Sequence, residues 1–411
     1  NCMNKISPFY GAPLQAFGYG HPMRQDCAYR HLISPPVFSA QNNKENHNRG
    51  YYNCIPFLGL ERLERIVPGI EMASSSLLGS GSGTGKSKLV RFLYIHTPLM
   101  YLEQNPLEDI KYNCILFSLE ESKKKIILSE ISRYLYTKYN KVVSIKDLQS
   151  IGRYNTLSVE DLKLVKEAEE HINKFLEYVD IQDEIRNPTG IFKYCRDFAL
   201  QIGTYYNKNN VPLSPEEVNN IKNGIGEDYK KIAYYKTHHP RHFVIIIIDH
   251  ISLIFPEKNE SLRDAMGNLS SKYLLRLRDK FGFTPIVVQQ FSLAKENVEF
   301  NYSGKTIEEK LEPSIDSFSE NKTLVRDFNY VYGLYNPSRY GIQQHGGYNI
   351  SFMRDNYRSL KILKSRDGIS DVQVPLFFNG ASDVFKECPR IEDEVNLGKM
   401  YSYIEKLRNG K

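Results

Sequence analysis

The sequence contains no tryptophan and only six cysteines among its 411 residues. The cysteines form no C-x-x-C pair, so neither a zinc motif nor a disulfide framework is indicated, and we expect free thiols in a reducing, cytoplasmic setting. No apolar run approaches the length of a membrane span, and the first residues carry no secretory signal. We therefore expect neither a membrane protein nor a disulfide-rich secreted protein.

A strong excess of one charge is also missing. The 54 lysines and arginines nearly balance the 48 aspartates and glutamates, which leaves a net charge of +6. This mild basic excess permits a polyanionic partner but does not require one. The hydrophobic share of 41% and the charged share of 25% are ordinary for a globular chain.

A glycine-rich segment is the most informative feature that is present. It follows a short apolar run and precedes residues 87–102, whose apolar side chains recur at helical spacing. Glycines let successive N–H groups curl around an anion, and the N-terminus of the next helix adds its positive end. The pattern G-x-x-x-x-G-K-[ST] is met, except that Ser80 replaces its first glycine. The expected ATP-binding residues are Gly81, Ser82, Gly83, Thr84, Gly85, Lys86 and Ser87, with Lys86 on the β- and γ-phosphates and Ser87 on Mg²⁺.

From about residue 51 onward, apolar strand patterns alternate with helical ones. This alternation is typical of an α/β fold with a mostly parallel central sheet flanked by helices. The run 243–248 is the strongest strand pattern, and its unbroken β-branched residues place it centrally in the sheet. Further strands are expected at 73–78, 112–118, 176–181, 285–290, 330–334, 359–363 and 372–378, and helices at 87–102, up to 138, from 189, at 215–223 and at 261–281.

The chain divides into two unequal parts. Residues 1–50 have no sustained period and indicate either an extended, irregular N-terminal arm or disorder. Residues 51–411 form the expected ATPase domain, in which about 139–240 is a long, partly helical insertion.

Polar side chains end several expected strands, at the sheet edge where ligands of open α/β folds bind. Asp249 ends the most apolar strand, where a buried carboxylate needs a cation, and Mg²⁺ shared with Ser87 is the natural one. Glu120 follows the strand 112–118 and is the candidate to polarise an attacking water, with Glu121 as its rival.

Two more strand ends carry candidate catalytic groups. Gln290, or its neighbour Gln289, is placed to sense the γ-phosphate by hydrogen bonding. Lys364 and Arg366 follow the strand 359–363 and, as alternate residues of an extended segment, present both cations to one target. A nucleotide held by an adjacent subunit is such a target, and an arginine supplied in this way accelerates hydrolysis by roughly 10³–10⁵.

These motifs, in this order, resemble the RecA-like ATPase domain of DnaB-type replicative helicases. The likeness covers roughly residues 51–390 and departs from the family pattern at Ser80 and in a longer stretch between Glu120 and Asp249. Besides the glycine-rich loop and Gln290, it is carried by residues 57–69, by Phe-Ser-Leu-Glu at 117–120, by Ile-Asp-His at 248–250 and by Leu-Lys-Ser-Arg-Asp-Gly at 363–368.

The resemblance implies a DNA helicase that uses ATP and Mg²⁺ at the subunit boundaries of a ring, expected to be a hexamer. Single-stranded DNA would pass through the centre, held by the loops after Asp249 and Gln290. The N-terminal primase-docking domain of cellular members has no counterpart in this chain, so we expect a phage-type or truncated helicase in the host cytoplasm and leave contacts with a primase or a loader open. Candidate DNA contacts in the two loops are Lys258, Arg263, Lys295 and Lys305.

Two other functions stay open. A RecA- or RadA-like recombination ATPase would share the fold but form filaments rather than closed rings. A nucleotide-gated oligomeric scaffold would change shape on slow hydrolysis, without unwinding DNA. Glu120 and the pair of Lys364 and Arg366 argue against the scaffold, because it does not need a full hydrolytic set.

Overall fold

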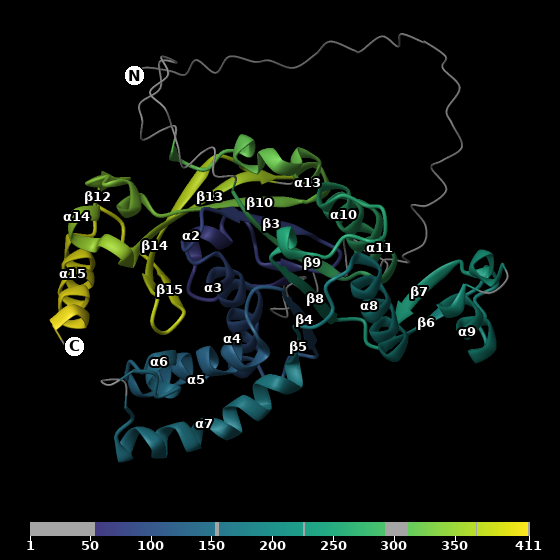
Figure 1. The fold of residues 1–411 in the computed structure, drawn as a ribbon, viewed down its shortest axis with the longest axis horizontal. Helices are drawn as coiled ribbons and strands as arrows, with labels where there is room; N and C mark the ends of the chain where they lie inside the picture. Colours follow the sequence, from purple (N-terminus) through teal and green to yellow (C-terminus); the bar gives the residue numbers. More distant parts are fainter. Residues whose placement is uncertain (1–53, 153–155, 225–226, 292–310, 367, 410–411) are drawn as a thin grey trace, which may run out of the picture.

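A single large sheet forms the centre of the computed structural model, and helices cover it (Figure 1). The structure describes residues 54–152, 156–224, 227–291, 311–366 and 368–409. Within these residues the sheet has nine strands, which in spatial order are β15 (Val384–Glu387), β14 (Val372–Asn379), β13 (Tyr357–Ser365), β10 (Tyr330–Tyr335), β3 (Ser76–Ser80), β9 (Thr284–Gln290), β8 (His242–Asp249), β4 (Lys111–Ser118) and β5 (Val179–Gln182).

The strands from β10 to β5 run parallel, whereas β13, β14 and β15 run antiparallel to their neighbours. The expected α/β fold with a mostly parallel sheet is therefore confirmed. Strand β8 lies between β9 and β4, and all its residues are buried, as its unbroken apolar run predicts. Successive side chains point to opposite faces of the sheet: Phe243, Ile245 and Ile247 enter one apolar core, and Val244, Ile246 and Ile248 enter the other.

Helices pack on both faces of the sheet (Figure 1). The expected helix 87–102 is present as a continuous run, and Pro98 lies in the turn that follows its π-helical part. Proline has no N–H to bond the carbonyl oxygen of Tyr94, and the Tyr112 hydroxyl donates to that oxygen instead. One face carries α3 (Lys86–Arg91), η2 (Phe92–His96), α4 (Thr97–Gln104), α5 (Lys123–Tyr139) and α7 (Val159–Tyr178); the other carries α8 (Pro188–Ile202), α10 (Leu262–Asn268), η5 (Leu269–Leu274), α11 (Leu275–Phe281) and α13 (Lys322–Asp327).

The long segment 139–240 is partly helical, as expected, but two details differ from the prediction. The strand expected at 176–181 begins only at Val179, because α7 continues to Tyr178. The helix expected from 189 begins one residue earlier, at Pro188. An unpredicted hairpin extends beyond α8 (Figure 1). The remaining elements here are α6 (Ile145–Leu148), β6 (Gly203–Tyr206), α9 (Pro215–Asn223), η3 (Asp228–Lys231) and β7 (Tyr234–Thr237).

Short elements complete the described part of the chain. A third apolar core lies under the C-terminal helix α15 (Glu394–Asn409).

The predicted arm, 1–50, lies outside the described residues, so the division of the chain into arm and domain stays a prediction. Across the described ranges, the helices all fall short of the length and apolar character needed to cross a membrane. The short elements are β1 (Cys54–Ile55), α2 (Glu61–Glu64), β2 (Ile70–Glu71), η4 (Ile251–Leu253), η7 (Ile315–Asn321), η8 (Pro337–Tyr340), β11 (Gln344–His345), β12 (Tyr348–Asn349), α14 (Ile350–Met353) and η9 (Arg354–Asn356).

Candidate nucleotide-binding site

The glycine-rich loop connects the end of β3 to the start of α3. Gly83 and Gly85 have φ angles of 64° and 98°, a left-handed conformation that strains residues with a side chain. Ser80, which stands at the position of the motif's first glycine, is the buried last residue of β3. Its hydroxyl donates to the carbonyl oxygen of Gly81 at 2.9 Å, and the Thr84 hydroxyl donates to the same oxygen at 3.0 Å. The serine therefore fits a tightly curled loop.

Two residues from distant strands brace this loop. The Nε of Arg358 on β13 donates to the carbonyl oxygen of Thr84 at 2.6 Å, and its guanidinium lies 4.7 Å from the centre of the Phe378 ring. Burial lowers the pKa of Arg358 to about 10, so the side chain stays charged at neutral pH. The Phe378 ring lies 3.3 Å from the position that a Cβ on Gly85 would take, so this glycine also leaves room for the ring. Sequence reasoning missed both residues.

Ser87 and Asp249 meet across the site. The Ser87 hydroxyl donates to Oδ1 of Asp249 at 2.8 Å, which brings the two expected Mg²⁺ ligands into direct contact. Asp249 is 2% exposed, and this burial raises its pKa to about 6, although Arg91, the Ser87 hydroxyl and Lys86 each favour its charged form. A buried carboxylate whose charge is incompletely compensated is suited to a divalent cation.

The two neighbouring glutamates have different surroundings. Oε2 of Glu121 accepts from Nη1 of Arg91 at 2.9 Å, and its Oε1 lies 2.8 Å from Nζ of Lys125. These cations lower the pKa of Glu121 despite its burial. The Glu120 carboxylate is 51% exposed, and its Oε2 lies 3.8 Å from Nε2 of His250. Glu120 is therefore the freer carboxylate of the two, at the mouth of the site.

A cavity of about 250 Å³ lies over the start of α3. The buried Lys86 reaches it from below, and both glutamates border it. The buried lysine, the Ser87 hydroxyl and the carboxylates around the curled loop fit a magnesium nucleotide. Such a ligand would extend beyond this small cavity toward solvent. Its lining residues are Gly83, Gly85, Lys86, Ser87, Lys88, Glu120, Glu121, Phe378 and Gly380.

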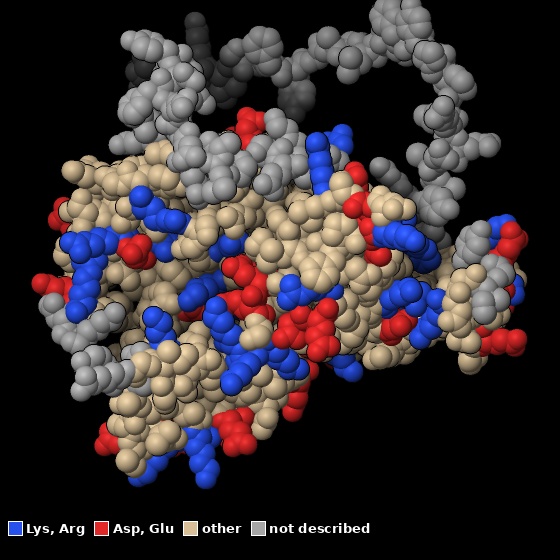
Figure 2. All heavy atoms as spheres, viewed as in Figure 1, with Lys and Arg blue, Asp and Glu red and all other residues tan. Residues whose placement is uncertain are grey.

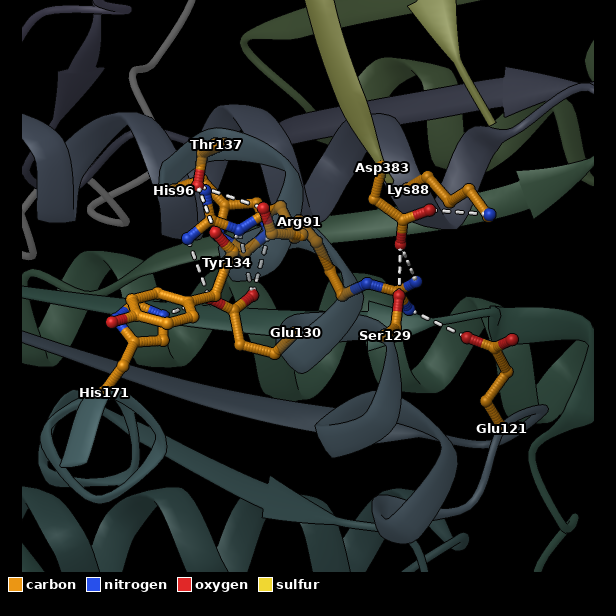
Figure 3. A network of polar contacts seen from close by, with 11 residues as sticks. Lys88, Arg91, His96, Glu121, Ser129, Glu130, Tyr134, Thr137, His171 and Asp383 are labelled. Atoms are coloured by element: carbon orange, nitrogen blue, oxygen red, sulfur yellow. Dashed lines mark hydrogen bonds and ion pairs between the residues drawn. The ribbon is translucent and has the colours of Figure 1, made fainter. Parts of the chain in front are cut away.

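A buried ion network ties the site to the C-terminal strands (Figure 3). Arg91 on α3 pairs with Glu121 on one side and with Asp383, at 3.2 Å, on the other. Asp383 also pairs with Lys88 at 2.6 Å and accepts a hydrogen bond from Ser129 of α5. Although burial opposes it, Arg91 lowers the pKa of Asp383, so the carboxylate stays charged. The turn between β14 and β15 is thereby held against the helix that follows the loop.

The two candidate glutamines lie on opposite faces of the sheet. Gln289 is fully buried, and neither its amide nitrogen nor its amide oxygen has a hydrogen-bond partner within the described residues. Gln290 is partly exposed and pairs with Ser80 at the end of β3. It stands two residues after Val288, which packs into the core beneath α3. Because alternate residues share a face, Gln290 lies on the nucleotide side.

Lys364 and Arg366 lie at the other edge of the sheet. Strand β13 is antiparallel to β10. Ser365 pairs with Tyr330, which in turn pairs with Ser76 at the start of β3. The expectation that Lys364 and Arg366 lie at the same ends of the strands as the glycine-rich loop is therefore wrong within a single chain. They lie near the start of β3, the loop follows its end, and the five residues of β3 alone span about 16 Å. Lys364 donates to the carbonyl oxygens of Val325 and Arg326, whereas Arg366 is exposed.

Of the four candidate DNA contacts, two lie outside the described residues, namely Lys295 and Lys305. Lys258 and Arg263 are both exposed, on the segment after β8. The structure thus places two basic side chains a short way along the chain from Asp249.

Comparison with known proteins supports the fold. No protein-family model and no curated protein sequence matches the chain. Among solved structures, one that is described as an ATPase domain superposes with a TM-score of 0.57 at 17% identity and covers 85% of this chain and 98% of its own. A DnaB-like replicative helicase, described with its interactions with primase, superposes with a TM-score of 0.56 at 16% identity and covers 85% of this chain and 68% of its own. The chain has the RecA-like fold of a DnaB-type helicase ATPase domain.

Proposed function

We propose that this protein is an ATP-dependent replicative DNA helicase that moves along single-stranded DNA. The observation that carries the proposal is the contact of Ser87 with Asp249 at 2.8 Å, beside the buried Lys86 and below the exposed Glu120. On a RecA-like sheet, this set supplies an anion cradle, a cation site and a free carboxylate at one edge.

Each side chain has one role in this proposal. The curled loop and Lys86 bind the β- and γ-phosphates of ATP, and Ser87 and Asp249 hold Mg²⁺, which neutralises phosphate charge when bound. Glu120 orients the attacking water and accepts its proton. Gln290 contacts the γ-phosphate from the neighbouring strand and relays its presence to the loop that follows.

The opposite edge of the sheet supplies the other half of the site. Because Arg366 is exposed and far from the loop of its own chain, it fits a role on the nucleotide of an adjacent subunit. Lys364 holds the end of α13 and positions the segment that presents Arg366. Such a head-to-tail contact forms a closed ring or an open filament, and we propose a ring of six subunits with ATP at each boundary.

Single-stranded DNA is the proposed substrate in the central channel. On the face seen in Figure 2, basic and acidic side chains are interspersed, without a broad basic field. A contact confined to a few loops suits this surface better than a wide electrostatic one. We further propose a phage-type replication role in the cytoplasm of the host, and a primase or a loader as partner.

An unwinding assay tests the proposal. The parent protein should open a forked duplex with ATP and Mg²⁺, and single-stranded DNA should stimulate its hydrolysis. Lys86→Ala should lose ATP binding, whereas Glu120→Gln should bind ATP without unwinding; Lys386→Ala, at an exposed lysine of β15, is the matched control. Strand exchange without unwinding would identify a recombination ATPase instead, and hydrolysis that ignores DNA would identify a scaffold.

A further inference from the structure

Phe255 is an aromatic side chain held in solvent. It follows η4 on the segment after β8 and is 59% exposed. Of the phenylalanines in the described ranges it is the only exposed one, since the others are buried or half-buried. The ring is therefore accessible to a ligand that approaches from solvent.

The backbone around this ring is fixed. The Phe255 amide donates to the carbonyl oxygen of Arg186 at 2.9 Å. Two residues on, the Glu257 carboxylate accepts from the side chain of Asn187 at 2.9 Å and from the amide and the hydroxyl of Thr189 at 3.2 and 2.6 Å. The loop is thereby fastened to the start of α8, and the ring is presented from a rigid base.

A cation accompanies the ring. The guanidinium of Arg186 lies 5.6 Å from the ring centre, within the range of a cation–π contact. Lys258, three residues further on, is exposed. The Glu257 carboxylate between them stays charged, because hydrogen bonds from Thr189 and Asn187 lower its pKa, and these bonds hold it against the start of α8. An aromatic platform backed by an arginine, with a lysine beside it, is a recurring means of holding unpaired nucleotides.

We propose that Phe255 stacks on a base of single-stranded DNA, with Arg186 supporting the ring from its other side. This inference rests on the proposed function and adds a base contact to a grip that otherwise depends on phosphates. The segment begins six residues after Asp249, so a shift at the nucleotide site is transmitted to the stacked base through a short, hydrogen-bonded stretch of chain.

The test compares two oligonucleotides of equal length, an oligothymidylate and its abasic analogue, by fluorescence anisotropy with the full chain, Mg²⁺ and a non-hydrolysable ATP analogue. The parent should bind the thymidylate roughly tenfold more tightly than the abasic strand. Phe255→Ala should remove this difference, and Phe255→Tyr should keep it. Leu262→Ala, at an apolar residue 42% exposed at the start of α10, is the control and should bind as the parent does.

Salt dependence separates stacking from charge. Phe255→Ala should leave the slope of log affinity against log salt unchanged, whereas Lys258→Ala should reduce it by about one. Equal binding of both oligonucleotides by the parent, or unchanged binding by Phe255→Ala, would overturn the stacking role and leave the helicase proposal standing. A parent that binds neither strand would overturn the helicase proposal itself. Unchanged ATP-analogue binding shows that each variant is folded.

Discussion

At the scale of single residues, two adjacent glutamates show how surroundings assign roles. Glu121 is held by Arg91 and Lys125, so its carboxylate is occupied in the folded chain. Glu120 faces solvent at the mouth of the cavity, and its Oε2 lies 3.8 Å from Nε2 of His250, whose pKa is lowered by burial and by Lys86, so the imidazole is neutral. The first arrangement suits a structural ion pair and the second suits a group that meets a water and a substrate.

Substitution of each glutamate by glutamine should separate these roles. Glu120→Gln should lower the rate of ATP hydrolysis by about 10²–10⁴ and leave thermal stability unchanged. Glu121→Gln should lower the free energy of unfolding by about 1–3 kcal/mol, because the buried Arg91 loses a charged partner, and should keep most of the activity. Steady-state hydrolysis and urea unfolding measure the two effects. A loss of stability in Glu120→Gln together with a loss of hydrolysis in Glu121→Gln would mean that the two glutamates have the opposite roles.

Asp249 offers a second prediction at this scale. Burial raises its pKa to about 6 from an ordinary value of 3.8, so the folded state without ligand is penalised whenever the group is charged. The penalty is complete above pH 6 and vanishes below pH 3.8, where both states are protonated. Asp249→Asn should therefore raise the free energy of unfolding at pH 7 by about 1–3 kcal/mol and abolish Mg²⁺-dependent ATP binding. A less stable variant in urea would contradict this reasoning.

The residues that local patterns mark could be predicted, and those set by the fold could not. Lys86, Ser87 and Asp249 stand in a loop motif or at the end of an apolar run. Arg91 and Asp383, in contrast, are 292 positions apart and meet only after the sheet is assembled. The sequence favoured Glu120 but left Glu121 as its rival, and the ion pairs in the structure give the two carboxylates different surroundings.

At the scale of elements, a buried polar cluster joins η2, α5 and α7. Glu130 accepts from Arg133 at 2.7 Å and bonds His171 at 2.8 Å, and His96 lies 3.6 Å away. Burial, together with the charge of Arg133, lowers the pKa of His96 to about 3, so this histidine is neutral in the folded chain. Figure 3 shows the cluster beside the ion network of Arg91, along the same helix.

This cluster predicts sensitivity to acid. His96 is neutral when folded but takes up a proton below pH 6.5 when unfolded, so stability is lost as the pH falls from 6.5 toward 3. Between pH 7 and pH 5 the loss from this one group is about 2 kcal/mol. His96→Gln should reduce the pH dependence of unfolding by that amount, and the exposed His238→Gln should not. An unchanged profile for His96→Gln would rule out this origin.

Elements with a clear period were predictable, but their direction was not. The apolar runs at 112–118, 243–248 and 285–290 match β4, β8 and β9 to within a residue. Nothing in the pattern of 359–363 reveals that β13 runs against its neighbour, because strand direction is set by how the chain returns to the sheet. The short hairpin of β6 and β7 was missed because its alternation spans only four residues on each side.

At the scale of the whole molecule, the two proposed halves of the ATP site lie at opposite ends of the strands of the sheet. The loop, Asp249 and Glu120 lie where the parallel strands end, and Arg366 lies near where β3 and β10 begin. A single chain cannot bring these halves together, since the sheet between them is rigid and fully packed. We therefore propose that neighbouring subunits are arranged head to tail, so that each completes the site of the next.

Mixing two inactive variants tests this central claim most directly. Lys86→Ala subunits keep Arg366, and Arg366→Ala subunits keep an intact loop, so neither should hydrolyse ATP alone. In an equal mixture that exchanges subunits, about a quarter of the boundaries join an intact loop to an intact arginine, and activity should return to that level. Lys86→Ala mixed with the double variant forms no such boundary and serves as the control. Co-assembled mixtures that stay inactive would contradict the account.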